Sequence, residues 1–367
     1  MLQSNQKRII EIFFEVARIN ALSQKEKPVA DYLRSFLSSP LVKVTEDNSY
    51  THTGSDTGNI ICRIGDGGDT VLLSHMDTAR PTLDTIPTLR NDKIVSDGKN
   101  VLGVDNRAGI TALLYALELA ILGKFKARDI TVAFTTCEEI TLGGSMNLDL
   151  NGKIKKGLVF DSSYRPGNFI NSACGALGFT IKVSGKAAHS GLEPEKGINS
   201  IAAASKAIAR IEQGKLDDNT TLNIGRISGG SQVNVVPEET MVEGEIRSFD
   251  AKKIEYLFKN VKETFFKEAS NLGASVNVRK DWSFKPYTIS DTEEVYRELS
   301  SVIKKVGLKP TPRKSLGGSD ANSLNSRGIK TINLGIGAQK PHSNEEFIYV
   351  EDLVKASEIA IELIKQN

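Results

Sequence analysis

The sequence is poor in cysteine, tryptophan and histidine. Its 367 residues include three cysteines, one tryptophan and four histidines. The cysteines, Cys62, Cys137 and Cys174, are odd in number and never form a Cys-x-x-Cys pair. This pattern argues against a disulfide framework and against a thiolate metal site. It fits a reducing compartment, so we expect a cytoplasmic protein.

An excess of one charge is also absent. Lysine and arginine total 47 and aspartate and glutamate 45, which leaves a net charge of +2. No dense basic stripe with interleaved aromatic residues is present, which argues against a nucleic-acid partner. No uncharged apolar run has the length of a membrane span. The apolar residues of the first twenty positions are interrupted by Glu11, Glu15 and Arg18, unlike a secretory signal. We therefore expect neither a nucleic acid nor a membrane as a partner.

The order of the apolar runs predicts two domains. Strand-like runs such as 70–74 and 130–135 alternate with helical patterns such as 106–122. This alternation predicts an α/β domain whose mostly parallel sheet is covered by helices. Ser23 and Glu26 have the spacing of a capping box, which predicts a helix start just before Val29.

After about residue 171 the pattern becomes strand–helix–strand–strand–helix–strand. That order is the split βαβ arrangement of a small α+β domain. Since the α/β pattern returns near the C-terminus, we predict that the small domain is inserted into the larger one. The predicted boundaries are 1–173 and 286–367 for the α/β domain and 174–285 for the inserted domain.

Side chains that can bind metal gather where the predicted strands of the α/β domain end. These strand-end or post-strand positions hold His75, Asp105, Glu138, Glu139, Asp161 and His342. α/β proteins place their sites at the carboxyl ends of parallel strands. Imidazole and carboxylate groups are zinc ligands, and a pair of metals needs a carboxylate that bridges them. Two histidines and three carboxylates can give each metal a histidine, a terminal carboxylate and a share of the bridge. In the Glu138–Glu139 pair, one carboxylate can bind metal while the other accepts a proton.

Each of these residues also has an ordinary structural explanation when taken alone. His75 can be a hydrogen-bonded histidine, and Asp105 can be the N-cap of a helix. Glu138 and Glu139 can be solvated loop charges, and Asp161 a turn residue. Their joint occurrence at strand ends favours the metal site, because structural roles do not select those positions.

Eight stretches of the chain resemble the dinuclear zinc peptidase family that includes peptidase T, aminoacylase and the carboxypeptidase-G-type enzymes. The resemblance is greatest to the peptidase T-like members. The stretches follow the family's order: SHMDT (74–78), DGKNVLGVDNRAG (97–109), TTCEE (135–139), LVFDSS (158–163), GKAAHSG (185–191), NVVPE (234–238), GGSDAN (317–322) and NLGIGAQKPHSNEEF (333–347).

The resemblance implies a ligand set for two divalent metal ions. It assigns His75 and Asp161 to one metal and Glu139 and His342 to the other, with Asp105 as the bridge. Zn²⁺ is the expected metal, and the same ligands also accept Co²⁺ or Mn²⁺. Relatives often have a cis peptide after the bridging residue, where this chain has Asn106 in place of a second aspartate.

The resemblance also assigns the catalytic carboxylates and the inserted domain. Glu138 matches the general base, and Asp77 matches a carboxylate that orients His75. The inserted domain corresponds to a ferredoxin-like lid that often dimerises, so we expect a homodimer formed through it. His189 in this lid matches a histidine that polarises the scissile carbonyl, with a surface loop histidine as the alternative.

Three further residues are implied to bind substrate. Asn234 and Arg247 match positions that contact substrate, although a turn residue and a surface salt bridge are equally good explanations for them. Gly318 lies in a loop expected near the carboxylate end of the substrate, although its glycines can instead serve a tight turn.

The implied function is metal-dependent hydrolysis of short peptides, with release of the N-terminal residue. Deacylation of N-acyl amino acids and carboxypeptidase action on the same site remain alternatives. Two more distant alternatives are a non-catalytic binding protein and a dinuclear phosphoesterase. For the phosphoesterase, Arg80 and Arg107 are the nearest basic candidates.

Overall fold

The computed structural model describes residues 4–150 and 152–366 and divides the chain into two compact units. Unit 1 comprises the residues up to Ser172, Thr288–Lys314 and the residues from Ser319 onward. Unit 2 comprises Ala173–Tyr287 and the short segment Ser315–Gly318. This segment joins unit 2 because the Cys174 N–H donates to the Ser315 carbonyl at 3.0 Å.

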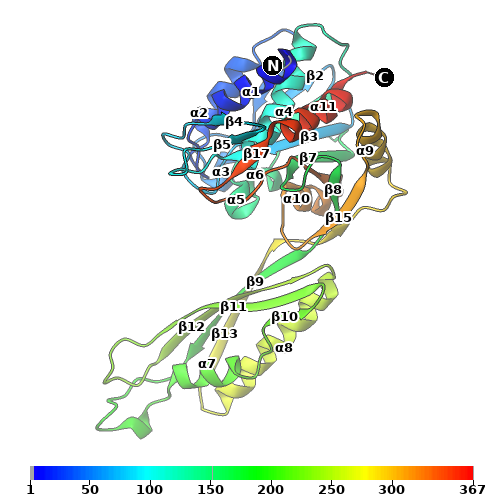
Figure 1. The fold of residues 1–367 in the computed structure, drawn as a ribbon. Helices are drawn as coiled ribbons and strands as arrows, with labels where there is room; N and C mark the ends of the chain where they lie inside the picture. Colours follow the sequence, from blue (N-terminus) through cyan, green and yellow to red (C-terminus); the bar gives the residue numbers. More distant parts are fainter. Residues whose placement is uncertain (1–3, 151, 367) are drawn as a thin grey trace. The chain divides into compact units, whose positions relative to one another are not determined.

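Unit 1 is built around a sheet whose central strands are parallel (Figure 1). Its strand order in the described residues is β1 (Lys43–Glu46), β2 (Ile60–Ile64), β6 (Ile130–Thr135), β3 (Thr70–His75), β7 (Lys156–Ser162), β16 (Lys330–Gly335), β8 (Asn168–Ala173) and β14 (Tyr287–Thr288), with β15 (Thr311–Ser315) paired to β8. The four strands β6, β3, β7 and β16 pair in parallel, and β1, β2 and β8 pair antiparallel. Every residue of β3 and β6 is buried, as expected for strands covered on both faces.

Helices cover this sheet. One layer consists of α1 (Ser4–Ala17), α4 (Val104–Ile121) and α11 (Val350–Ile364), which pack on one another while α4 packs on β3 and β7. In Figure 1, α10 lies on the other side of the sheet from α11. The remaining elements are α2 (Lys27–Phe36), α3 (Tyr50–Thr53), α5 (Glu138–Thr141), α6 (Gly143–Met146), α9 (Glu294–Lys305), α10 (Asp320–Ser326) and a small sheet of β4 (Thr88–Arg90), β5 (Lys93–Val95) and β17 (Phe347–Tyr349). No helix in the described ranges combines the length and the apolar character that crossing a bilayer requires.

The capping box predicted before α2 is wrong. The N-cap of α2 is Glu26, and its side chain caps no backbone group of its own helix. Ser23 Oγ instead donates to Asp77 Oδ2 at 2.6 Å, and Glu26 is fully buried and accepts the Cys137 N–H. Tertiary partners outcompete the local cap here because buried carboxylates need donors.

The start of α4 departs from regular helix. Gly103 has a left-handed φ of 72°. Asp105 and Asn106 have non-helical dihedrals, and the peptide bond that joins these two residues is cis. Beyond this point the helix continues to Ile121, close to the predicted end at 122. The irregular start places Asp105 between the helix and the ends of the strands.

Unit 2 has the ferredoxin-like topology. Its elements are β9 (Gly175–Ser184), η1 (Pro194–Lys196), α7 (Ser200–Ile208), β10 (Gly214–Asp217), β11 (Thr220–Gly229), β12 (Glu239–Ser248), α8 (Ala251–Ser270) and β13 (Ser275–Phe284). The sheet order is β10-β11-β12-β9-β13, with every neighbouring pair antiparallel. Phe179, Phe258 and Phe265 belong to the core that α7 and α8 share with the sheet. The short strand β10 is an addition that the sequence pattern did not predict.

We predict that Gly109→Ala destabilises unit 1. A Cβ at this position of α4 would lie 2.2 Å from the Phe160 carbonyl oxygen and 2.3 Å from Asn106 Oδ1. The helix would have to move away from β7, which should cost about 1–3 kcal/mol of unfolding free energy. Urea unfolding of the metal-free protein measures this, with Gly152→Ala as control because nothing lies within 4 Å of its Cβ position. Equal stability of the two variants would contradict the packing argument.

Candidate metal centre

The parallel strands bring the predicted ligands to one edge of the sheet. His75 is the last residue of β3, and Asp161 lies at the end of β7. Glu139 follows β6 in α5, and His342 lies in the loop after β16. The spatial order of these four strands is β6-β3-β7-β16, so residues far apart in sequence share one edge.

His75, Asp105 and Asp161 form the first group of side chains. His75 Nε2 lies 3.1 Å from Asp105 Oδ1 and 3.3 Å from Asp161 Oδ1. The His75 side chain is 1% exposed, and those of Asp105 and Asp161 are 18% and 11% exposed. Asn106 and Asn333 donate their side-chain amides to Asp161 at 3.2 Å each. The carboxylate is therefore held toward His75.

His342, Asp105 and Glu139 form the second group. His342 Nε2 lies 3.5 Å from Asp105 Oδ2 and 3.3 Å from Glu139 Oε2. Asp105 thus presents one oxygen to each group. Ligand atoms of His75, Asp105 and Glu139 lie within 4.8 Å of one another, a grouping able to hold a metal ion. The donors are imidazole nitrogens and carboxylate oxygens, which suits Zn²⁺ and similar divalent ions.

Asp77 holds both the first histidine and the two glutamates. Its Oδ1 lies 3.4 Å from His75 Nδ1, and its backbone carbonyl lies 3.1 Å from the same nitrogen. Because both neighbours are acceptors, Nδ1 carries a proton, which would leave the Nε2 lone pair to a metal ion when one is bound. Asp77 also accepts the backbone N–H groups of Glu138 at 3.1 Å and Glu139 at 3.2 Å.

The carboxylates of the centre lie close together, so a positive charge among them would stabilise their ionised forms. Burial and the neighbouring Asp105 raise the pKa of Asp161 to about 6. Burial likewise raises the pKa of Glu138 well above its usual value. Hydrogen bonds to Asp105 and Glu139 raise the pKa of His342 to about 10. Buried carboxylates that cannot all stay ionised without a nearby cation are suited to binding one.

Glu346 is a residue of this centre that the sequence argument missed. It is 2% exposed, and it accepts the N–H of Gly103 at 2.6 Å and of Asp105 at 3.2 Å. Burial, together with the charge of Asp105, raises the pKa of Glu346 to about 7. Glu346 lies four residues after His342, so one loop supplies a side chain of the second group and an anchor for Asp105. Glu346 belongs to the sequence stretch NEEF (344–347), and its spacing of four residues from His342 is the sequence feature that could have identified it.

The other predicted site residues lie in unit 2. His189 is exposed and its Nδ1 accepts the Gly191 N–H at 3.2 Å. The Ser190 N–H donates to the Asn234 carbonyl at 2.9 Å, and a β-bridge joins His189 to Val235. The structure therefore brings the loops of His189 and Asn234 together.

Arg247 and Gly318 also lie close together within unit 2. Arg247 forms an ion pair with Glu245 at 2.8 Å and donates Nη1 to the Leu316 carbonyl at 2.9 Å. Its guanidinium lies over the Phe284 ring, 5.8 Å from the centroid. A Cβ on Gly318 would lie 2.5 Å from that ring. Close approach to Phe284 therefore requires glycine at position 318.

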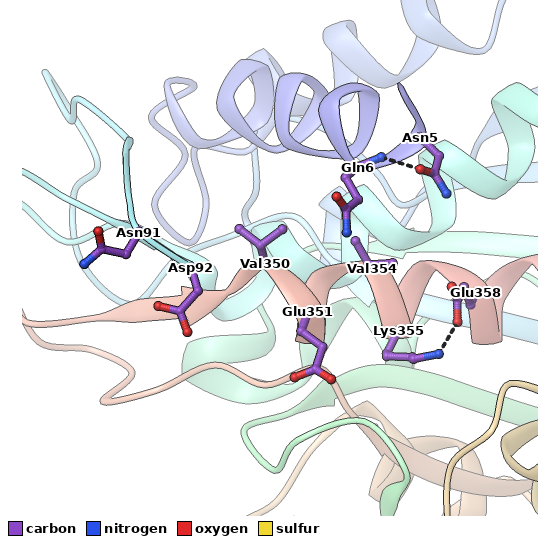
Figure 2. Close-up of a pocket in the computed structure, with 9 residues that line it drawn as sticks. All are labelled: Asn5, Gln6, Asn91, Asp92, Val350, Glu351, Val354, Lys355 and Glu358. Carbon is purple, nitrogen blue, oxygen red and sulfur yellow. Dashed lines mark hydrogen bonds and ion pairs between the residues drawn. The ribbon is translucent and has the colours of Figure 1, made fainter. Parts of the chain in front are cut away.

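A separate cavity of about 480 Å³ lies elsewhere in unit 1 (Figure 2). It is lined by the start of α1, the turn between β4 and β5, and the first turns of α11. Figure 2 shows Asp92, Glu351 and Lys355 among its side chains. None of the predicted site residues lines this cavity.

Fold and centre together define an α/β metallohydrolase with an inserted ferredoxin-like domain. A family model described as a peptidase dimerisation domain matches residues 171–272. The YqjE protein of Bacillus subtilis is 32% identical over 366 residues, which cover 99% of each chain. The crystal structure of aminopeptidase PepT from Bacillus cereus matches with a TM-score of 0.89 and 32% identity over 98% of each chain. A tripeptidase structure from Staphylococcus aureus matches with a TM-score of 0.91 and 30% identity, again over 98% of each chain.

The chain therefore belongs to the M20 peptidase family, among its peptidase T-like members. Its enzyme class is metallopeptidase, of the exopeptidase kind. These findings confirm the family resemblance, the fold class and the enzyme class that the sequence predicted.

We predict that His342→Ala removes one of two metal equivalents. The His342 side chain is 50% exposed and contacts Asp105 and Glu139, so its loss should weaken one group and leave the core intact. Titration of metal-free protein with Zn²⁺ should show two tight equivalents in the wild type and one in the variant. His52→Ala is the matched control, since His52 is exposed and its ring forms a hydrogen bond with the neighbouring Thr51 hydroxyl. Two tight equivalents in the His342 variant would contradict the assignment.

Proposed function

We propose that this protein is an aminopeptidase that releases the N-terminal residue of short peptides with the help of two divalent metal ions. His75 and Asp161 would hold one ion, Glu139 and His342 the other, and Asp105 would bridge them. The observation that carries the proposal is the position of Asp105, whose two oxygens face the two histidine–carboxylate groups separately. The similar PepT and tripeptidase structures support a peptide substrate and cleavage at the N-terminus.

The donor set suits Zn²⁺, and Co²⁺ or Mn²⁺ would also fit. When bound, such ions supply electrophilic activation of the scissile carbonyl and of water. The protein's contribution is to keep the ligands in place before any ion arrives. Asp77 does so for His75, and Glu346 does so for the turn that carries Asp105.

Glu138 is the proposed general base. It stands next to the ligand Glu139, and Asp77 fixes the backbone N–H groups of both residues. Glu138 would accept the proton of the attacking water and pass it to the departing amine. Burial raises the pKa of Glu138, which suits a carboxyl group that must both take up and return a proton.

His189 is proposed to stabilise the oxyanion that forms at the carbonyl. The Gly191 N–H donates to His189 Nδ1, so a neutral ring carries its proton on Nε2. That proton is available as a donor to developing negative charge. The neighbouring Asn234, together with Arg247 and the Gly318 loop, is proposed to contact the rest of the peptide. Arg247 would contact the peptide while its guanidinium keeps the ion pair with Glu245.

The match of unit 2 to a peptidase dimerisation domain supports a homodimer formed through that unit. A cytoplasmic location remains the expectation from cysteine usage. Of the two basic candidates for a phosphoesterase, Arg107 is fully buried and donates to the Met76 and Ile19 carbonyls, so it is not available to bind a phosphate. Arg80 donates to the His342 carbonyl at 3.3 Å. A non-catalytic protein is disfavoured because each position implied for a ligand or the base holds a competent side chain.

We predict that Glu138→Gln and Glu139→Gln fail in different ways. Loss of a general base should lower kcat by about 10²- to 10⁴-fold. Glu138→Gln should do so with two metal equivalents still bound, whereas Glu139→Gln should also lower the metal content. Tripeptide hydrolysis and metal analysis of the purified variants measure both effects. Glu345→Gln is the control, because this exposed side chain forms a surface ion pair with Lys340. Full activity of Glu138→Gln would remove the base assignment.

We predict that a free N-terminal amine is required in the substrate. A set of tripeptides, their N-acetylated forms and N-acyl amino acids separates the three related activities. An aminopeptidase should cleave the free tripeptide after its first residue and leave the acetylated form intact. Cleavage of acyl amino acids would favour a deacylase, and release of the C-terminal residue would favour a carboxypeptidase. Mass spectrometry of the products identifies the bond that is cut.

A further inference from the structure

Three consecutive backbone N–H groups at the start of α5 are bound by two buried carboxylates. The Cys137 N–H donates to Glu26 Oε1 at 2.9 Å. The N–H groups of Glu138 and Glu139 donate to the two oxygens of Asp77. The first N–H groups of a helix have no partner in their own helix, so outside acceptors determine where this turn begins.

The turn that these carboxylates hold has an unusual backbone. Cys137 has a φ of 52°, in the left-handed region, and its side chain is fully buried. A non-glycine residue keeps such a conformation only when its surroundings enforce it. The turn links β6 to the two glutamates. The carboxylate of Glu139 contacts His342 and accepts the Ala79 N–H. The direction of both glutamates therefore depends on Cys137.

Glu26 is itself held in a single orientation. Its side chain is fully buried, Oε2 accepts the Ser55 hydroxyl at 2.5 Å, and Oε1 also accepts the Gln24 N–H at 2.9 Å. Although Glu26 is the N-cap residue of α2, its side chain caps no backbone group of that helix. Ser23, three residues earlier, donates to Asp77 Oδ2 at 2.6 Å. The short segment from Ser23 to Glu26 therefore supplies one of the two carboxylates that bind the turn and a hydrogen-bond donor to the other.

We propose that Glu26 is a positioning residue, which fixes the Cys137 turn so that Glu139 can bind metal while Glu138 accepts the proton. The inference rests on the proposed function of this centre. It assigns a catalytic purpose to a buried carboxylate more than 100 positions from the residues it controls. Glu26 acts through the backbone of the turn and touches no substrate.

The test compares Glu26→Ala with Glu26→Gln. Alanine removes the acceptor for the Cys137 N–H, whereas the glutamine carbonyl can still accept it. Glu26→Ala should lose about 10- to 100-fold in metal affinity and in kcat, as expected when an outer partner of metal ligands is removed, with KM nearly unchanged. Glu26→Gln should recover most of both. Titration of metal-free protein with Co²⁺, followed by visible absorption, reports affinity without relying on activity.

Glu268→Ala is the matched control for general destabilisation. Glu268 is a buried carboxylate of unit 2 that pairs with Arg210, so its loss should lower stability without changing Co²⁺ affinity or kcat. If Glu26→Ala does not fold, Ser55→Ala decides the question, because it removes the hydroxyl that orients Glu26. We expect Ser55→Ala to lose threefold or more in Co²⁺ affinity.

The outcomes separate this inference from the proposed function. A folded Glu26→Ala with wild-type Co²⁺ affinity and kcat would overturn the positioning role alone, and so would an unchanged Ser55→Ala when Glu26→Ala does not fold. A wild-type protein that binds no pair of Co²⁺ ions and cleaves no peptide would overturn the proposed function, and the positioning role with it.

Discussion

The carboxylate of Asp105 must face two histidines at once, and much of unit 1 is arranged to allow this. His75 ends a strand in the middle of the sheet, and His342 lies in a loop more than 260 positions later, yet both ring nitrogens come within 3.5 Å of Asp105. Asp105 lies at the irregular start of α4, where Gly103 has a left-handed conformation and Asp105 itself has non-helical dihedrals. The parallel strand order then brings the remaining ligands to the same edge.

Buried carboxylates anchor the backbone throughout this region. Glu346 binds the turn before α4, Asp77 binds the N–H groups of Glu138 and Glu139, and Glu26 binds that of Cys137. Burying a carboxylate costs free energy unless hydrogen-bond donors surround it. The first backbone N–H groups of a helix can be these donors, because they have no partner within the helix. The same contacts therefore satisfy the carboxylates and fix the turns that carry the ligands. A centre held in this way keeps its geometry before metal binds.

Prediction from the sequence succeeded where a physical pattern repeats. Continuous apolar runs identified β3 and β6 because both faces of these strands are covered. The change of pattern near 171 revealed the inserted α+β unit because its strand and helix order differs from the rest. Prediction failed at Ser23 and Glu26, whose spacing matched a helix cap while their side chains bind Asp77 and Cys137. Local spacing carries no information about partners that lie 54 and 111 positions away.

By itself, the sequence determined the family, the fold class and the kinds of side chain that the strand ends would present. These properties follow from periodicity and from motifs whose order along the chain is readable. Only the tertiary structure decided that Asp105 faces both groups, that Glu346 and Glu26 anchor the turns, and that Gly318 packs against Phe284. Such contacts depend on how distant segments approach one another, and that approach is set by packing of the whole sheet rather than by neighbouring residues.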